Sequence, residues 1–115
     1  MTASITRISE AFSRHSFDET YDHMLDDIEW TVVGGRTITG KADVAAACRE
    51  SMSELVNVTT TFHAFKVVTA DNCVVIDSRA EYVDADGEVS RVASCDIYDF
   101  IDARLAAITS YMLEL

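Results

Sequence analysis

Apolar and polar residues alternate through the second half of the chain, and this period of two predicts three long strands. The strands span Cys73–Val83, Ser90–Phe100 and Arg104–Leu115. The first turn, Asp84–Gly87, contains the Asp-Gly pair typical of a hairpin, and the second, Ile101–Ala103, is short enough for another. Long antiparallel strands twist and curve, so one face of this sheet needs a cover of apolar side chains.

Helical periodicity in the first half predicts that cover. Apolar residues recur on one helical face over Ile5–Phe12, with Thr2 or Ser4 as the expected cap. Ser16 followed by Glu19 matches the capping-box pattern and predicts the start of a second helix. The apolar stripe of this helix consists of Phe17, Tyr21, Met24 and Leu25. Asp26-Asp27 is its expected end.

The remaining segments predict two shorter extended pieces, a third helix and one more strand. Ile28–Val33 is rich in β-formers and is broken by Gly34-Gly35, after which Arg36–Thr39 is a short strand or an extended arm. A 3.6-residue period predicts a helix over Gly40–Asn57, and Val58–Val68 is a strand. We therefore expect an α+β fold, a cone-shaped curved antiparallel sheet wrapped around three N-terminal helices, with a cavity at its open end.

Composition narrows the classes of function. The 115 residues predict a single domain, 1–115, and 9 Lys+Arg against 20 Asp+Glu give a net charge of -11, which disfavours nucleic acid and anionic membranes as partners. The chain has no long apolar run and no apolar signal core, so we expect a cytoplasmic protein. Cys48, Cys73 and Cys95 lack CxxC spacing, which indicates neither a disulfide framework nor a zinc site, and we expect no metal or cofactor.

Several segments resemble the nuclear transport factor 2-like superfamily, which includes SnoaL-like cyclases, ketosteroid isomerases and limonene epoxide hydrolases. The segments that carry the resemblance are Ile28–Trp30, Gly40–Val44, Ala80–Gly87, Cys95–Phe100 and Ile108–Tyr111. They extend over nearly the whole chain in the order of elements given above. The resemblance implies the cone-shaped α+β barrel of that superfamily, but it says less about function, because the fold serves enzymes, binding modules and dimerisation domains.

Comparison with the ketosteroid isomerases singles out Asp96. In those enzymes an aspartic acid in apolar surroundings stays protonated and donates a hydrogen bond to the substrate. The catalytic base of the isomerases would fall at Trp30-Thr31, and their tyrosine at Arg7 or Ile8, so two of the three groups are missing. The resemblance therefore disfavours steroid isomerisation.

Comparison with the epoxide hydrolases is also partial. Their Arg-x-Asp pair falls at Asp77-Ser-Arg79, where the two residue types are reversed, and their second aspartate falls at Ser110. A reversed pair can still form an ion pair in a cavity. It does not by itself imply activation of water for attack on an epoxide.

The direction of one charged row decides which residues reach the cavity. Alternation places Asp77, Arg79 and Glu81 on one face of their strand. The other face carries Ile76, Ser78, Ala80 and Tyr82. The resemblance implies that the charged face is concave, whereas composition alone places these charges in solvent. We predict the concave placement, with Asp77 and Arg79 beside the pocket and the opposite, more apolar face pairing with a second copy of the chain.

Asp96 is the carboxyl that we expect to carry chemistry, as a general acid/base or a hydrogen-bond donor, with Arg79 and Asp77 as the other catalytic candidates. The alternative for Asp96 is a structural ion pair with Arg79. His15 and His23 could reach a pocket mouth, but surface placement is favoured. The candidate substrate-binding residues are Trp30, Phe62, His63, Glu81, Tyr98 and Ser110.

Two functions remain open. The first is a cofactor-free enzyme of isomerase, cyclase or hydrolase type that acts on a small apolar molecule with a carbonyl group. The second is a non-catalytic ligand-binding or dimerisation domain of the same fold. The missing isomerase groups favour the second, and a polar concave face would favour the first.

Overall fold

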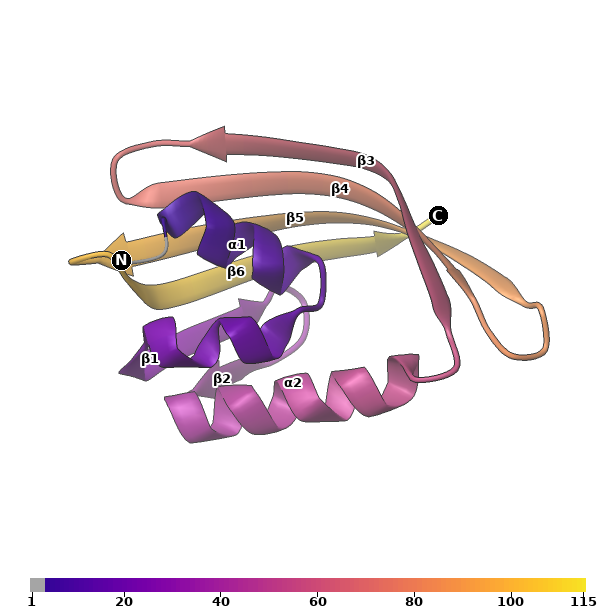
Figure 1. Ribbon diagram of the computed structural model, residues 1–115, viewed down its shortest axis with the longest axis horizontal. Helices are drawn as coiled ribbons and strands as arrows, with labels where there is room; N and C mark the ends of the chain where they lie inside the picture. The colour runs from indigo at the N-terminus through magenta and orange to yellow at the C-terminus, as the bar shows by residue number, and fades with distance from the viewer. Residues whose placement is uncertain (1–3) are drawn as a thin grey trace.

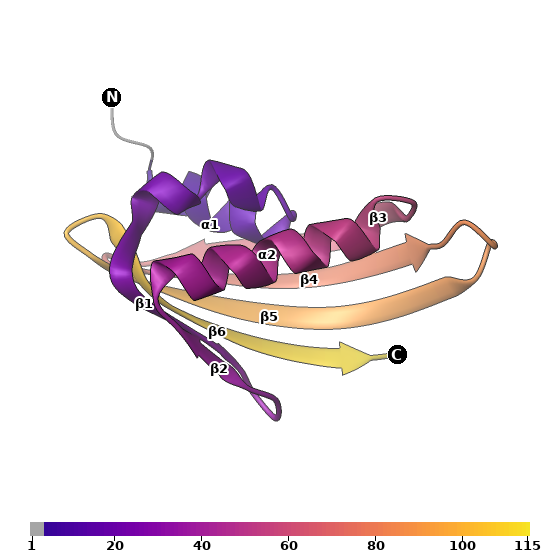
Figure 2. The ribbon, with the colours of Figure 1, turned by 90° about the horizontal axis from the view of Figure 1, so that it is seen from below.

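A long curved sheet with helices against its concave face makes up the structure, a computed structural model that describes residues 4–115 (Figures 1 and 2). The helices are α1 (Ile5–Ser13) and α2 (Lys41–Leu55). The strands are β1 (Met24–Val32), β2 (Thr37–Thr39), β3 (Thr59–Thr69), β4 (Cys73–Val83), β5 (Val89–Ile101) and β6 (Arg104–Glu114). The predicted α+β class, with the helices in the first half of the chain, is confirmed.

The sheet is mixed rather than wholly antiparallel, and it does not close into a barrel. Its strand order is β2-β1-β6-β5-β4-β3, and β1 runs parallel to β6 while every other neighbouring pair is antiparallel. The parallel pair is possible because α2 and strands β3–β5 lie between β1 and β6 in the sequence, which gives the long connection that parallel strands need. The β1–β2 hairpin thereby forms one edge of the curved sheet and β3 forms the other.

Helix α1 begins as the sequence predicts. The Ser4 side chain caps it by accepting a hydrogen bond from the Arg7 backbone N–H at 3.2 Å, while the alternative cap, Thr2, lies outside the described residues. Ile8 and Phe12 face the sheet and are buried. The helix is followed by His15 in the left-handed region, with φ 68°, which turns the chain sharply.

The predicted second helix is wrong. Two short 3₁₀ turns, Phe17–Glu19 and Tyr21–His23, stand in its place, and the Ser16 side chain makes no capping bond. Buried Thr20 separates the turns and donates its hydroxyl to the Phe17 carbonyl oxygen, so it packs as part of a turn rather than a helix. Met24 and Leu25, expected in the helical stripe, are the first residues of β1, where Met24 is fully buried.

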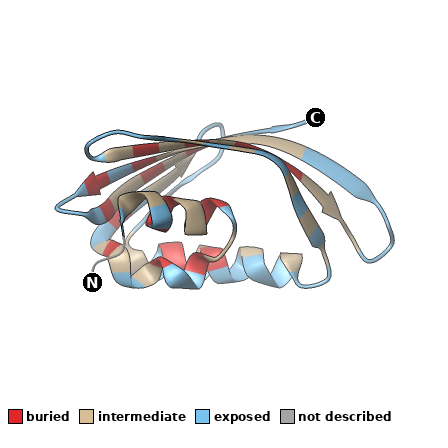
Figure 3. Ribbon diagram, turned by 45° about the horizontal axis from the view of Figure 1, so that its top comes forward, coloured by how far each residue is buried: buried red, intermediate tan, exposed pale blue. Residues whose placement is uncertain are grey.

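Helix α2 lies across the concave face, and only its first half is buried. Val44, Ala45 and Cys48 pack into the core, whereas the last turn, ending at Leu55, stands away from it. The core is therefore concentrated at one end of the sheet, and the ends of β4 and β5 extend beyond it into solvent (Figure 3). Within residues 4–115, no helix has both the length and the apolar character needed to cross a bilayer.

The strand register fixes which side chains share a face. Ile76 pairs with Asp96, which in turn pairs with Ser110, and this row points to the concave side. Asp77 pairs with Cys95 on the opposite, convex side. Asp77 and Asp96 therefore lie on different faces of the sheet, because neighbours across a strand pair point the same way.

Candidate functional site

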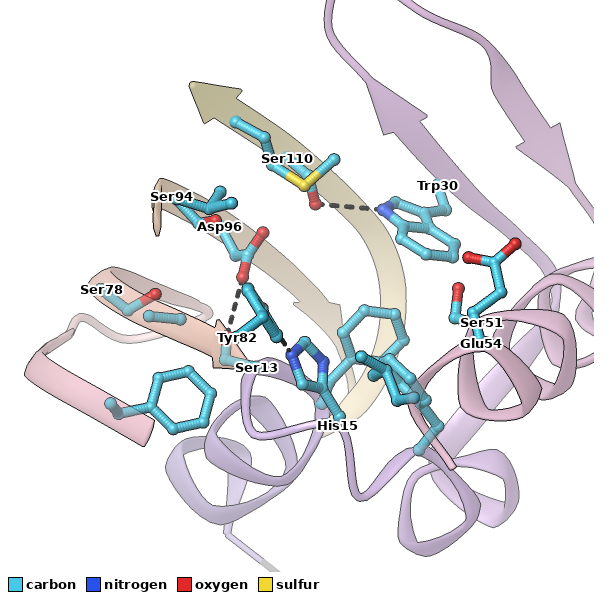
Figure 4. Close-up of a pocket in the computed structure, with 17 residues that line it drawn as sticks. Ser13, His15, Trp30, Ser51, Glu54, Ser78, Tyr82, Ser94, Asp96 and Ser110 are labelled. Carbon is cyan, nitrogen blue, oxygen red and sulfur yellow. Dashed lines mark hydrogen bonds between the residues drawn. The ribbon is translucent and has the colours of Figure 1, made fainter. Parts of the chain in front are cut away.

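A cavity of about 310 Å³ lies between the core and the open end of the sheet, under α2 and the turn that follows α1 (Figure 4). This volume is at the small end of the range for ligand pockets. The lining residues are Phe12, Ser13, His15, Phe17, Trp30, Ser51, Glu54, Leu55, Phe62, Ser78, Ala80, Tyr82, Val92, Ser94, Asp96, Ser110 and Met112.

Successive rows of paired residues mark the depth of the cavity. The Asp96–Ser110 pair lies next to the core, because Tyr98 and Ile108 one step further along the same strands are fully buried. In the opposite direction Ser94 pairs with Met112, whose side chain is largely exposed. The polar groups of Asp96 and Ser110 therefore lie at the inner end, and the cavity opens toward Met112.

The Asp96 carboxyl points into the cavity and is held by hydroxyl groups (Figure 4). Ser13 at the end of α1 donates a hydrogen bond of 2.9 Å to Asp96 Oδ2. Burial raises the pKa of Asp96, although hydrogen bonds from Ser110, Ser13 and Tyr98 and the charge of His15 act in the opposite direction. The protonated carboxylic acid consequently persists to a higher pH than in an exposed aspartate.

Tyr98 supports this carboxyl from behind the cavity wall. Its hydroxyl lies 2.6 Å from Ser13 Oγ, and its ring is fully buried. Ser13 Oγ also donates to Asp96, so the two hydroxyl groups and the carboxyl form one hydrogen-bonded cluster. In this cluster Tyr98 lies behind the cavity wall, whereas Asp96 faces the ligand space.

The other predicted residues that reach the cavity are Trp30, Phe62 and Ser110. Trp30 Nε1 donates a hydrogen bond of 3.0 Å to Ser110 Oγ, which joins β1 to β6 across the inner end. The Trp30 ring also meets the Phe12 ring edge to face, with centroids 5.2 Å apart. These contacts give one apolar wall whose orientation is fixed.

The prediction that the charged face of β4 points into the cavity is wrong. Asp77 and Arg79 lie on the convex face, where they form an ion pair of 2.6 Å with about half of each side chain exposed. Their strand is turned the other way because Val74 and Ile76 are fully buried, so the face that carries Ile76 must be the concave one. Asp96 consequently makes no structural ion pair with Arg79, and an exposed pair such as Arg79–Asp77 contributes little stability.

Glu81 and His63 are also placed outside the cavity. His63 Nε2 lies 2.8 Å from Glu81 Oε2 on the convex face, and 57 % of the His63 side chain is exposed. Alternation places His63 on the face opposite to Phe62, which lines the cavity, and a bulge in β3 leaves His63 as the extra residue between Phe62 and Ala64. Neither residue can contact a molecule bound beside Asp96.

Two lining residues, His15 and Tyr82, carry polar atoms that the sequence did not assign to the site. His15 Nε2 lies 3.0 Å from the Tyr82 hydroxyl (Figure 4). Burial lowers the pKa of His15, against an opposing effect of Asp96, and burial together with the Asp96 charge raises the pKa of Tyr82. Both groups are therefore uncharged over more of the neutral pH range than their exposed counterparts.

A signal in the sequence does point to the α1 contribution. Ser9 and Ser13 interrupt the apolar face of α1, and both are buried. The Ser9 hydroxyl donates to the Ile5 carbonyl oxygen in the same helix, whereas the Ser13 hydroxyl donates to Asp96. Within residues 4–115, no three His, Cys, Asp or Glu side chains gather closely enough to hold a metal ion.

Comparison with known proteins relates this architecture to a single family. A model of the SnoaL-like domain matches residues 5–108. An NTF2-like protein of unknown function from Cytophaga hutchinsonii is 34 % identical, with a TM-score of 0.82 over 93 % of this chain and 94 % of that one. No curated protein sequence matches the chain.

More distant solved structures share the fold. A protein from Xanthomonas campestris, provisionally named a polyketide cyclase, is 18 % identical, with a TM-score of 0.72 over 90 % of this chain and 83 % of that chain. An LEH-like epoxide hydrolase from M. tuberculosis is also 18 % identical, with a TM-score of 0.71 over 95 % and 82 % of the two chains. At this level of identity the likeness concerns the fold alone.

Proposed function

Because the chain belongs to the SnoaL-like domain family, we propose that its cavity binds a small apolar molecule with a carbonyl group and that Asp96 performs acid/base chemistry on it without a cofactor. The observation that carries this proposal is the half-buried Asp96 carboxyl, whose pKa is raised, at the inner end of a mostly apolar cavity. A carboxylic acid that keeps its proton can donate a hydrogen bond to a carbonyl oxygen and stabilise the negative charge that develops there.

The hydrogen-bond pattern around Asp96 supports the donor role. Ser13 donates to Oδ2 and the carboxyl lines the cavity, so in its protonated form it can turn its own hydrogen toward a ligand. Aromatic rings of Phe12, Trp30 and Phe62 supply apolar walls. The lining residues among the described part of the chain include the acidic Glu54 but no lysine or arginine, which favours an uncharged ligand over an anion.

A non-catalytic ligand-binding domain is the second candidate. It is favoured by the convex position of Asp77, Arg79 and Glu81, which leaves Asp96 and Glu54 as the carboxylates that line the cavity within residues 4–115. A cavity of this kind can hold a carbonyl compound without transforming it. Loss of deuterium from the methyl group of acetophenone separates the two candidates, because only an acid/base enzyme accelerates that exchange beyond the buffer rate.

We expect Asp96 to titrate above the usual aspartate range and to control binding of acetophenone labelled with carbon-13 at its carbonyl. Carbon-13 NMR of labelled aspartate measures the first quantity, and ligand titration measures the second. Asp96→Asn keeps a donor and should bind within about threefold of the parent, whereas Asp96→Leu should lose about tenfold or more, as expected for a buried hydrogen bond to a charged or strongly polar partner. Titration at or below the usual value, with unchanged binding by Asp96→Leu, would refute the donor role.

We also propose that the convex face joins two copies of the chain into a homodimer. Its central residues are apolar or small and lie on β5 and β6: Ala93, Cys95, Ile97, Tyr111 and Leu113. Ser78, Ala80 and Tyr82, which the sequence placed on this surface, line the cavity instead. Tyr111 and Leu113 are 48 % and 66 % exposed, as expected of an apolar patch that lacks its partner.

Sedimentation at micromolar concentration tests the dimer. The wild-type chain should sediment at twice its mass of 12.7 kDa. Cys95→Glu places a charge at the centre of the convex face and should yield monomers. Met52→Glu is the matched control, since Met52 is exposed on α2 and should leave the dimer intact. A wild-type monomer at these concentrations would contradict the proposal.

A further inference from the structure

His15 and Tyr82 form a hydrogen-bonded pair in the cavity wall that the proposed role of Asp96 does not use. His15 Nε2 and the Tyr82 oxygen are 3.0 Å apart. The His15 backbone adopts φ 68° as the residue that ends helix α1, where His15 N–H donates to the Phe12 carbonyl oxygen and Ser16 N–H to that of Ala11. Its ring packs against Phe17 and Phe62, with centroids 5.5 and 5.9 Å away. The ring is therefore held in one orientation against β4.

The surroundings of the His15 ring assign its proton. Nδ1 is closed off from solvent and has no hydrogen-bond partner within the described residues. Burial lowers the pKa of His15, so the ring is neutral and carries one proton. A buried N–H without an acceptor is rarer and costlier than an unpaired acceptor, so Nδ1 is the bare nitrogen and the proton lies on Nε2. Nε2–H consequently donates to the Tyr82 oxygen.

The direction of this bond determines where the hydrogen of the Tyr82 hydroxyl can point. Since its oxygen accepts from His15, its own hydrogen must point elsewhere, and no other side chain or backbone group in residues 4–115 accepts it. Tyr82 lines the cavity together with His15 and Asp96. Burial and the Asp96 charge raise the pKa of Tyr82, so the hydroxyl keeps its hydrogen. That hydrogen is available to whatever occupies the cavity.

We infer that Tyr82 is a second hydrogen-bond donor to the bound molecule and that His15 is a positioning residue that aims the Tyr82 hydroxyl into the cavity. The inference rests on the proposed function, in which Asp96 is the first donor. Two donors favour a ketone or an ester over the corresponding alcohol, because the alcohol brings a hydroxyl hydrogen that neither donor can accept. The second donor thereby adds discrimination against alcohols to the preference for uncharged carbonyl compounds proposed above.

Nitrogen-15 NMR of the wild-type chain tests the first step. We expect His15 at neutral pH to show a protonated Nε2 and a bare Nδ1. A proton on Nδ1 would reverse the hydrogen bond to Tyr82 and overturn the inference. This measurement needs no variant and no ligand, so it is independent of the folding of any mutant.

Two matched probes, acetophenone and 1-phenylethanol, test the second step. Tyr82→Phe should weaken acetophenone binding about 3- to 10-fold, the effect of one net hydrogen bond, and should reduce the preference for the ketone over the alcohol. Tyr21→Phe removes a hydroxyl from a residue that packs against the core outside the cavity lining and should change neither value. His15→Phe should behave like Tyr82→Phe, whereas His15→Gln, which keeps an N–H donor, should recover part of the affinity.

The outcomes separate this inference from the function on which it rests. If acetophenone binding depends on Asp96 but is unchanged in Tyr82→Phe, Tyr82 is not a donor and the inference fails alone. If the wild-type chain binds neither probe, the proposed function fails and the inference fails with it. Equal losses of ketone and alcohol affinity in Tyr82→Phe would also overturn it, because they would indicate a loss of packing and not of a directed hydrogen bond.

Discussion

The Phe12→Ala variant is expected to unfold with a free energy about 3–5 kcal/mol below that of the wild-type chain. Phe12 is 4 % exposed, and its ring meets the rings of Phe17, Trp30 and Tyr98 at centroid distances of 4.8, 5.2 and 5.8 Å. Removing it takes away the common partner of three aromatic side chains and leaves a void beside the existing cavity. For a domain of ordinary stability, this is a large share of the total.

Urea denaturation measures the loss, with Phe62→Ala as the matched control. Phe62 also lines the cavity, but it is only partly buried and packs on Phe65 and His15 at the edge strand. We expect a clearly smaller destabilisation from that change. Equal losses for the two variants would mean that the aromatic cluster around Phe12 does not organise the core.

The second large effect is expected in the pH dependence of stability. Burial raises the pKa of Asp96 in the folded chain, so the native state holds this proton more tightly than the unfolded state does. The resulting stabilisation is complete below the unfolded pKa and is lost as the pH rises through the folded pKa. Within that window the free energy of unfolding should fall by up to about 1.4 kcal/mol per pH unit for this one proton.

Asp96→Asn removes the titration and should remove this slope. His15 acts in the opposite sense, since its lowered folded pKa makes stability rise as the pH passes upward through its folded value toward its unfolded value. The difference between the wild-type and Asp96→Asn curves, measured by urea denaturation across the acid to neutral range, therefore reports the titration of Asp96 together with its coupling to His15. Parallel curves would show that the carboxyl has the same proton affinity in both states.

The strands and α2 could be predicted from the sequence because their patterns are local. The ends of β4 at Cys73 and Val83 are those that alternation gives, and α2 ends at Leu55, within two residues of the expected stop at Asn57. The second helix could not be predicted in this way. Its apolar residues are spaced for a helix, but Met24 is fully buried as the first residue of a strand, and tertiary packing outweighs the local pattern.

The resemblance and the composition disagree about which face of β4 is concave, and the composition is correct. Val74 and Ile76 lie on the face opposite to Asp77 and Arg79, and their complete burial leaves the charges outside. Burying two charged side chains costs more than burying two aliphatic ones. The apolar rule alone would therefore have assigned the faces of this strand correctly.

The candidate site also contains residues that the sequence indicates and residues that only the fold brings together. Asp96 could be singled out because it matches an aspartic acid of the ketosteroid isomerases, and its hydroxyl partner on α1, Ser13, interrupts an apolar face of that helix. The His15–Tyr82 pair could not, since it depends on a left-handed turn and on the facing of β4. Neither property is encoded in the spacing of these two residues.

The parallel pairing of β1 with β6 bears on the lifetime of the native state. Trp30 and Ser110, which hydrogen-bond across this pair, are 80 residues apart, whereas β3 to β6 join their neighbours through short turns. Closing so long a loop costs more entropy than forming a hairpin, so we expect the β1–β6 pairing to form after the folding transition state. Contacts formed that late govern how fast the chain unfolds rather than how fast it folds. A molecule bound between Trp30 and Asp96 is therefore expected to lower the rate of unfolding.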